Sequence, residues 1–556
     1  MQKLPPFLPV PEVPESERST LVQAFLELIE ALQQQDHMLR QQVEALVIGD
    51  AALREQNHAL QEQVEALKQE VARLKGHSGK PNVQPSRLGR EDKKKKKKRK
   101  KNDRNKGGGG PPEQRQVDET VVVKAENVPP GSQFKGYADF TVQELVIKPR
   151  ITRYRLEKWL QADGHLLTAQ LPPQIQHGHF GPMLVSFVLY QYYHGNVTEP
   201  LIVQQLREWG VYISSGQVHR LITEGKERFH REKDQILRVG LQLSPYVHVD
   251  DTGARHQGKN GYCTHIGNEL FAWFQSTDSK SRMNFLSLLR AGNRDCVLNE
   301  QAIEYMRQQK LPLCQIEFLS AHLGRFFPDE QQWRQALDDW GISDERHIRI
   351  ATEGVLLGSA LEHGLNPELI VLSDDAGQFN ILLHALCWVH AERTIAKLVG
   401  FNDDQRAALE NVRNQIWDLY QILKAYKEAP GENKKTEIRG RFNLIFRQHT
   451  CFATLNLALE RLYKNNKELL LVLDHPELPL HNNLSEGDIR EYVKRRKLSG
   501  GTRSDEGRRC RDTFASLKKT CRKQGISFWH YLQDRVMGMG AIPALPELIA
   551  ARAQAP

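Results

Sequence analysis

The sequence predicts a multidomain α/β protein that begins with a coiled coil. Three observations support this prediction. Leucine recurs every seven residues from Leu32 to Leu74, a linker poor in apolar residues follows, and two apolar runs further on each end in a pair of aspartates. The first pattern is typical of a long amphipathic helix, the second of unstructured chain and the third of buried strands. A chain of 556 residues has room for about two to four domains.

The positive charge of the chain is concentrated in one place. The formal net charge is +9, and the run from Lys93 to Lys101 alone contains nine lysines and arginines, so the remainder is close to neutral. This favours a segment that binds a polyanion over a uniformly basic surface. A solvated basic tract without a partner is the alternative interpretation.

Composition also predicts where the protein acts. No apolar run is long enough to cross a bilayer, and the N-terminus lacks the apolar stretch of a signal peptide. We therefore expect a cytoplasmic protein with no membrane partner. The seven cysteines are scattered without CxxC spacing, which predicts reduced thiols.

The N-terminal part divides into a tail (1–20), a parallel coiled coil (21–76) and a basic disordered linker (77–117). Leucine occupies the d positions of the heptads, and the a positions include Val43, Val64, Val71 and the polar Asn57. Leucine at d with valine at a favours two parallel strands, and an asparagine at a selects the dimer. A single long helix packed on its own protein is the alternative.

Residues 118–172 alternate between apolar and polar residues, which predicts a small β-rich segment. Residues 173–243 read as a helical domain. One helix should run from Thr198 to Trp209, and Ser214 or Ser215 should cap the next one. Two short helices joined by a turn containing glycine fit a DNA-binding helix-turn-helix, although an ordinary αα-hairpin has the same spacing.

Residues 244–540 are predicted to form the catalytic domain, with helical insertions at about 293–367 and 393–480, before a C-terminal tail (541–556). Its expected elements follow in order. They are a strand at 245–249, antiparallel strands at 262–267 and 270–276, a helix at 281–289, a strand at 369–375 and a late helix from Asn482 to Lys497. Three strands, a helix and a fourth strand are the order of a ribonuclease H-like core.

The candidate catalytic residues are carboxylates. Asp250 and Asp251 end the first strand, Asp374 and Asp375 end the fourth, and Glu486 lies one turn into a late helix capped by Asn482 or Asn483. Such carboxylates can bind two Mg²⁺ ions, which activate an oxygen nucleophile and polarise a phosphate. Neighbouring residues of a strand point to opposite faces, so one aspartate of each pair should reach the metals. Spacing alone does not choose between them.

Four motifs resemble those of one family, the transposases of the insertion sequence 66 type, which are DDE enzymes. The motifs are His248-Val-Asp-Asp-Thr252, Asp374-Asp-Ala-Gly-Gln-Phe-Asn380, Cys387-Trp-Val-His-Ala-Glu-Arg393 and Asn482-Asn-Leu-Ser-Glu486. The resemblance implies Asp250, Asp374 and Glu486 as the catalytic and metal-binding triad, with Asp251 and Asp375 as alternates. It implies two Mg²⁺ ions in each site, for which Mn²⁺ can substitute.

The resemblance also implies the reaction. The protein would bind the terminal inverted repeats of an insertion sequence, cleave phosphodiester bonds and join the 3′ ends to target DNA. Its partners would be DNA, a second copy or higher oligomer, and accessory transposition proteins. A decayed DNA-binding relative, or a ribonuclease H-like nuclease without strand transfer, are the alternatives. The family's four-cysteine zinc module lacks its cysteines here, because residues 103–262 contain none. The β-rich segment 118–172 is therefore expected to keep the fold of that module without zinc.

Two further groups of residues have expected roles. Arg490, Lys494 and Lys497 recur on the same side of the predicted helix as Glu486, and Arg495 and Arg496 widen the strip. We expect this face to bind the DNA backbone, although a solvated basic helix end is the alternative.

Cys387 and His390 have CxxH spacing. Two ligands are too few for a closed zinc site, which favours a structural role.

Residues 21–76 should dimerise in isolation as a parallel coiled coil. Asn57→Leu should broaden the distribution of oligomers, because a buried polar residue at an a position penalises the alternatives to the dimer. Analytical ultracentrifugation of the isolated segment and of the variant checks both statements. A monomeric wild-type segment would contradict the prediction.

Overall fold

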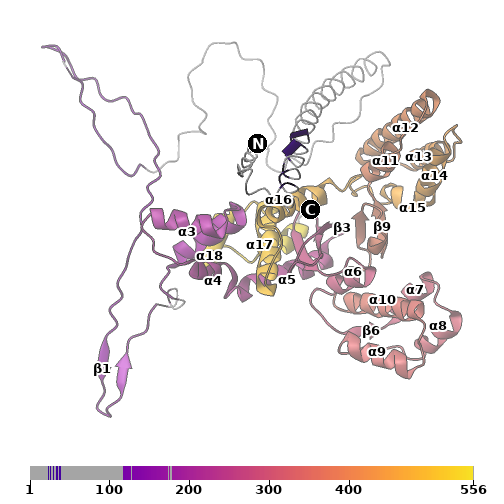
Figure 1. Cartoon of the computed structure of the whole chain (residues 1–556), viewed down its shortest axis with the longest axis horizontal. Helices are drawn as coiled ribbons and strands as arrows, with labels where there is room; N and C mark the ends of the chain where they lie inside the picture. The colour runs from indigo at the N-terminus through magenta and orange to yellow at the C-terminus, as the bar shows by residue number, and fades with distance from the viewer. Residues whose placement is uncertain are drawn as a thin grey trace. The chain divides into compact units, whose positions relative to one another are not determined.

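A computed structural model describes residues 117–126, 128–172, 175 and 178–554, together with seven residues between 23 and 38 (Figure 1). The chain divides into two compact units, Met1–Val83 and Gln84–Pro556. The seven described residues of the first unit are helical. The rest of the predicted coiled coil and almost all of the basic linker lie outside the described residues, so both stay predictions.

The segment 118–172 contains far less strand than its alternation predicts. Strands β1 (Lys158–Leu160) and β2 (Leu166–Thr168) pair antiparallel, and the other described residues of the segment form no strand. Apolar side chains are exposed here, with Phe140 and Ile151 both 91% accessible. An isolated two-stranded ladder with no covered face is marginal in water. The prediction of a small sheet is therefore wrong for most of this segment.

The predicted pair of short helices is present. Helix α3 (Glu199–Glu208) begins after Thr198, and α4 (Ser215–Thr223) begins after Ser214. Ser214 and Gln217 exchange side-chain-to-backbone hydrogen bonds in a capping box, which fixes the start of α4. The flanking elements are α2 (Pro182–Leu189), a π-helical turn (Tyr190–His194) and α5 (Glu227–Leu243).

A mixed five-stranded sheet forms the centre of the second unit. Its strands are β3 (Tyr246–Gly253), β4 (Tyr262–Gly267), β5 (Ala272–Thr277), β8 (Ile370–Ser373) and β9 (Leu383–Leu386). The order is β5-β4-β3-β8-β9. Strands β5, β4 and β3 are antiparallel, whereas β3, β8 and β9 are parallel. The strands predicted at 245–249, 262–267, 270–276 and 369–375 are confirmed within a few residues.

The first insertion is helical, as predicted, and contributes to the central core. Helix α6 (Arg282–Leu289), capped by Ser281, precedes it. The insertion contains β6 (Cys296–Leu298), α7 (Glu300–Gln308), α8 (Leu313–Ser320), β7 (Arg325–Phe327), α9 (Glu330–Asp339) and α10 (Glu345–Glu362). Strands β6 and β7 pair antiparallel, which the sequence did not predict. Buried residues of α10 pack in one hydrophobic cluster with those of β3.

The second insertion has its own core. It contains α11 (Trp388–Ala396), α12 (Asp403–Glu428), α13 (Glu432–Phe446), α14 (Ala453–Lys464) and α15 (Asn466–Leu469), which gather beside β9 (Figure 1). Ile370 and Leu372 of β8 pack with these helices, whereas Val371 packs in the central core. Alternate side chains of a strand point to opposite faces, so β8 separates the two cores.

The C-terminal residues complete the central core. Helices α16 (Asn483–Ser499), α17 (Asp505–Lys523), α18 (Phe528–Met537) and α19 (Leu545–Ala553) end the chain. Leu545 and Ile549 of α19 are buried in the same cluster as Ile236 and Leu237 of α5. The prediction of a tail at 541–556 is wrong, because its apolar residues pack on α5.

Residues 182–243 and the sheet also share this core, so the domain boundary predicted at residue 243 does not separate two hydrophobic cores. None of the described helices is long and apolar enough to cross a membrane.

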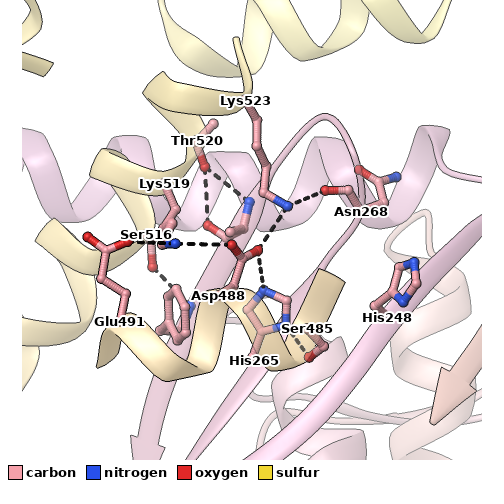
Figure 2. Close-up of polar contacts among 12 residues, drawn as sticks. His248, His265, Asn268, Ser485, Asp488, Glu491, Ser516, Lys519, Thr520 and Lys523 are labelled. Carbon is pink, nitrogen blue, oxygen red and sulfur yellow. Dashed lines mark hydrogen bonds and ion pairs between the residues drawn. The ribbon is translucent and has the colours of Figure 1, made fainter. Parts of the chain in front are cut away.

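Helix α16 is fixed to the sheet by a buried polar network (Figure 2). Asp488 lies 3.2 Å from His265 of β4, 3.3 Å from Lys519 and 2.9 Å from Lys523, both on α17. The His265 ring also bonds Ser485 Oγ at 2.7 Å. Burial acts to raise the pKa of Asp488, but Lys523, His265 and Lys519 outweigh it and hold that pKa well below its usual value. The network therefore contains an ionised carboxylate that needs all its partners.

Asp488→Ala should destabilise this unit by about 3–5 kcal/mol, because the buried Lys523 would lose its carboxylate partner. Urea denaturation followed by circular dichroism measures the change. Asp338→Ala is the control, since Asp338 is an exposed i,i+4 partner of Arg334 on α9 and should cost less than about 0.5 kcal/mol. Equal losses in the two variants would contradict the anchoring role.

Candidate active site

Two parallel strands bring Asp250 and Asp374 to the same edge of the sheet. Strand β3 pairs with β8 in a register that places Tyr246 beside Ile370 and His248 beside Leu372. Continued by two residues, this register places Asp250 beside Asp374. Neighbouring strands lie about 4.8 Å apart, so the two carboxylates leave adjacent backbones in the same direction. Asp250, the first aspartate of its pair, thus lies beside Asp374, the first aspartate of the other pair.

Asp251 has different surroundings from Asp250. Its Oδ1 accepts a hydrogen bond of 2.5 Å from Thr264 Oγ1 on β4, and its Oδ2 accepts one of 3.0 Å from Gln378 Nε2. Both carboxylate oxygens are therefore engaged by neutral donors. Asp250 Oδ1 instead accepts only from the backbone N–H of Asp251, at 2.7 Å, in the hydrogen bonds of the described residues. Asp250 is accordingly the member of its pair with free lone pairs.

Asp374 and Asp375 also have different surroundings. Asp375 adopts a φ of 78°, a left-handed conformation that is uncommon for a residue other than glycine. Its carboxylate accepts hydrogen bonds from Arg461 Nη2 at 2.7 Å and from Asn465 Nδ2 at 3.3 Å. Asp374 receives a backbone hydrogen bond of 3.3 Å from Ala376. The turn after β8 thus directs the carboxylate of Asp375 toward α14, which contains Arg461, and toward Asn465, which follows α14.

Asp250 experiences the charges of the other carboxylates. Burial, and next to it the charge of Asp374, raise its pKa to about 7, and the charges of Asp251 and Glu486 act in the same direction. The raised pKa means that the folded site favours a proton or a cation at Asp250 over an uncompensated negative charge. Like charges in a partly buried site are unfavourable unless a cation or a proton neutralises them. The edge of the sheet therefore favours a bound cation.

Glu486 extends from the first turn of α16 and is held by basic side chains. Its Oε1 lies 3.1 Å from Arg393 Nη1 and 3.6 Å from His390 Nε2, both on α11. Its Oε2 lies 3.3 Å from Arg490 Nη2, one turn further along α16. Only 17% of the Glu486 side chain is exposed. Two strands and two helices therefore contribute to one cluster, in which Glu486 is paired with arginines.

The donor set fits a hard divalent cation, because all three candidate ligands are carboxylates. In the described part of the chain, however, their oxygen atoms do not form a group that lies entirely within 4.8 Å. Glu486 is instead paired with Arg393 and Arg490. Glu486 would have to exchange these partners for a metal ion.

Asn482 connects the two sides of the site, a role that the sequence did not predict. It is the N-cap residue of α16, but its side chain does not cap the helix. Its Nδ2 donates to the Val249 carbonyl at 2.9 Å, and its Oδ1 lies 2.9 Å from Nδ1 of His248. Asn482 thus ties the start of α16 to β3 one residue before Asp250. The adjacent asparagines before Glu486 were the only signal for it.

Cys387 and His390 do not act as a pair. Cys387 is buried at the start of α11, where its Sγ accepts a hydrogen bond from the Asn482 N–H at 3.2 Å. Burial raises the pKa of Cys387 to about 11. His390 faces Glu486, and burial followed by the charge of Arg393 lowers its pKa. The contacts of Cys387 support the structural role expected for it, whereas His390 lies at the carboxylate cluster.

The basic residues of α16 point in three directions. Arg490, Lys494 and Lys497 are exposed. Arg496 donates to Thr252 Oγ1 at 3.2 Å and to the Gly253 carbonyl, so it contacts the end of β3. Arg495 is 8% exposed, and its guanidinium lies 3.8 Å from the ring centroid of Tyr192. The expectation that Arg495 binds DNA is therefore corrected, since its cationic group is packed on an aromatic ring inside the protein.

Comparison with known proteins gives the family of the chain. Residues 370–509 match the family model for the transposase IS66 family, and this range contains Asp374 and Glu486. An uncharacterized protein, y4jO, of Sinorhizobium fredii is 43% identical over 321 residues, which are 57% of this chain and the whole of that protein. The family model spans β8, β9, the second insertion and α16. The chain belongs to the transposase IS66 family.

Proposed function

We propose that this protein is a DDE transposase with a ribonuclease H-like catalytic core. The observation that supports the proposal is the convergence of Asp250, Asp374 and Glu486 at one edge of the sheet. The strand order β5-β4-β3-β8-β9, with the third carboxylate on a late helix, supports the ribonuclease H-like assignment. Its substrates would be the terminal inverted repeats of its element and a target DNA.

Asp250, Asp374 and Glu486 are the proposed ligands of two Mg²⁺ ions, for which Mn²⁺ should substitute. Such ions polarise a phosphate and lower the pKa of a bound water. The water would attack the phosphorus atom, and the 3′ oxygen of the element end would leave. That 3′ hydroxyl would then attack a phosphodiester of the target DNA, and the 3′ oxygen of the target strand would leave with the proton. The carboxylates position the reacting groups in both steps.

The ion pairs of Glu486 give the arginines a second role in this proposal. When Glu486 turns to a metal ion, Arg393 and Arg490 lose their carboxylate partner. Each guanidinium can then donate hydrogen bonds to phosphate oxygens, which it matches in geometry. Arg393 and Arg490 are therefore proposed to bind the DNA backbone beside the scissile bond. Metal binding at the site and DNA binding by these arginines would therefore be coupled through Glu486.

The remaining expectations complete the proposed function. The helices α3 and α4 would contact the element ends, and the N-terminal coiled coil would hold two or more copies together. Accessory transposition proteins and a cytoplasmic, nucleoid-associated location are proposed with it. A nuclease without strand transfer would cleave an element end but leave its 3′ hydroxyl unjoined, so a strand-transfer assay with pre-cleaved ends distinguishes the two activities.

Asp250→Ala, Asp374→Ala and Glu486→Ala should each reduce Mg²⁺-dependent cleavage of an element end by at least about 10³-fold, as expected for groups essential in the transition state. Binding of the same DNA without metal should be largely kept, as measured by gel mobility shift. The matched controls are Asp251→Ala and Asp375→Ala, which remove a carboxylate one residue away and should be milder. Full cleavage by one of the first three variants would remove that residue from the triad.

Lys494→Ala combined with Lys497→Ala should weaken binding to any DNA sequence and reduce the slope of log K against log salt by about two phosphate contacts. Fluorescence anisotropy at several salt concentrations measures the slope. Lys424→Ala with Lys434→Ala is the control, because it removes two exposed lysines from α12 and α13. An unchanged slope in the α16 variant would mean that these lysines only solvate the helix.

A further inference from the structure

A second group of potential metal ligands lies away from the carboxylate cluster. His230 of α5 faces Glu506 and Cys510, which lie one turn apart on α17. One ligand atom from each lies within 4.8 Å of the other two. His230 Nε2 is 3.2 Å from Glu506 Oε1 and 3.9 Å from Cys510 Sγ, and Cys510 Sγ is 3.7 Å from Glu506 Oε1. Three different donor atoms therefore converge on one point.

These separations fit one face of a tetrahedral zinc site. Zinc binds histidine nitrogen and carboxylate oxygen at about 2.0–2.2 Å and cysteine sulfur at about 2.3 Å. Ligand atoms at the corners of a tetrahedron with such bonds lie about 3.3–3.8 Å apart. The three observed distances bracket this range. Side chains would need to move by only a few tenths of an ångström to receive the ion.

The surroundings prepare the histidine for coordination. His230 is 1% exposed, and burial, followed by the charge of Arg509, lowers its pKa, which favours the neutral imidazole that a metal ion needs. Its Nδ1 lies 2.7 Å from Thr513 Oγ1. When Nδ1–H donates to Thr513, the lone pair of Nε2 points toward Glu506 and Cys510. A hydrogen bond of this kind to the second ring nitrogen is usual for a metal-bound histidine.

The site combines a closed interior with an open side. Cys510 is fully buried and its Sγ lies 3.4 Å from the Thr223 carbonyl at the end of α4. Glu506 is 44% exposed, so an ion can enter past its carboxylate. Burial, followed by the charge of Glu506, raises the pKa of Cys510 to about 12. Metal binding would have to displace this thiol proton, which would pass to solvent as the metal–sulfur bond forms. Lys226 lies close enough to favour the thiolate.

We propose that His230, Glu506 and Cys510 bind one zinc ion, with a water molecule in the fourth position. One thiolate, one imidazole and one carboxylate form a donor set that suits zinc better than Mg²⁺, which prefers oxygen alone. The ion would link α5 to α17, the helix that follows the catalytic α16. The rival account is a metal-free cluster in which His230 donates to Glu506 and Cys510 donates to Thr223.

Metal analysis of the full-length protein, purified without a histidine tag, separates the two accounts. We expect about one zinc ion per chain, bound by three protein ligands and a water as in zinc sites that keep an open position. Cys510→Ser and Glu506→Gln should lose at least about nine-tenths of it, because each removes one of only three protein ligands. Cys521→Ser is the matched control, since Cys521 is a buried cysteine on the same helix, and it should keep the zinc.

Cobalt gives a readout that identifies the sulfur ligand. Co²⁺ bound at this site should show a thiolate-to-metal charge-transfer band, which Cys510→Ser should abolish. Cys387→Ser and Asp374→Ala should keep both the band and the zinc, which separates this site from the carboxylate cluster. Thr513→Val should weaken zinc binding by about 10–100-fold through loss of the hydrogen bond to His230.

Three results would overturn the zinc proposal. The first is wild-type protein that binds no zinc and shows no cobalt band after incubation with these ions. The second is a Cys510→Ser variant that keeps its zinc, and the third is an Asp374→Ala variant that loses it. Circular dichroism of Glu506→Gln shows whether that variant is folded, and the half-exposed position of Glu506 makes folding the expected result. The zinc proposal and the proposed catalytic function are tested separately. If Asp374→Ala keeps its zinc, the zinc proposal stands, whether or not that variant loses DNA cleavage.

Discussion

Carboxylates of like charge do not lie side by side unless other interactions hold them there. Asp250 and Asp374 are fixed by the parallel register of β3 and β8, which is set by buried residues on both faces of β8. Glu486 has no such constraint from a sheet, and its position depends on how α16 is docked. The ion pairs of Asp488 with Lys519 and Lys523 provide that docking. The geometry of the site thus depends on a buried charge network two residues from a candidate ligand.

Helix α16 separates two electrostatic environments. Ser485, Asp488 and Tyr492 recur at helical spacing on the buried face, where each has a polar partner on β4, β5 or α17. Glu486 and Arg490 lie on the other face, beside α11. A helix can hold both sets because residues three or four apart share a face. The buried set fixes the helix, which leaves the outer set free to exchange partners.

Sequence patterns predicted those parts of the fold that depend on local periodicity. The strands around Asp250 and Asp374, the hairpin between Tyr262 and Thr277 and the start of α4 all follow from alternation, turns and caps. Features that depend on distant packing were not predictable in this way. The burial of Arg495 against Tyr192 and the bond from Asn482 to β3 join segments hundreds of residues apart. His230 and Cys510 are separated by 280 positions, so no motif spacing marks them.

The buried pair of Glu232 and Arg535 has a consequence for how the protein is made. Glu232, in α5, accepts hydrogen bonds from Arg535 at 2.9 and 3.0 Å and from the Leu545 N–H at 3.0 Å, and these partners lie about 300 residues later in the chain. During translation α5 leaves the ribosome long before them, and a buried carboxylate without partners is strongly unfavourable. The helical region cannot reach its final packing until α18 and the start of α19 have been synthesised. A ribosome that stops before α18 therefore releases a chain whose core is incomplete, so the sheet edge that carries Asp250 and Asp374 depends on synthesis of α18 and α19.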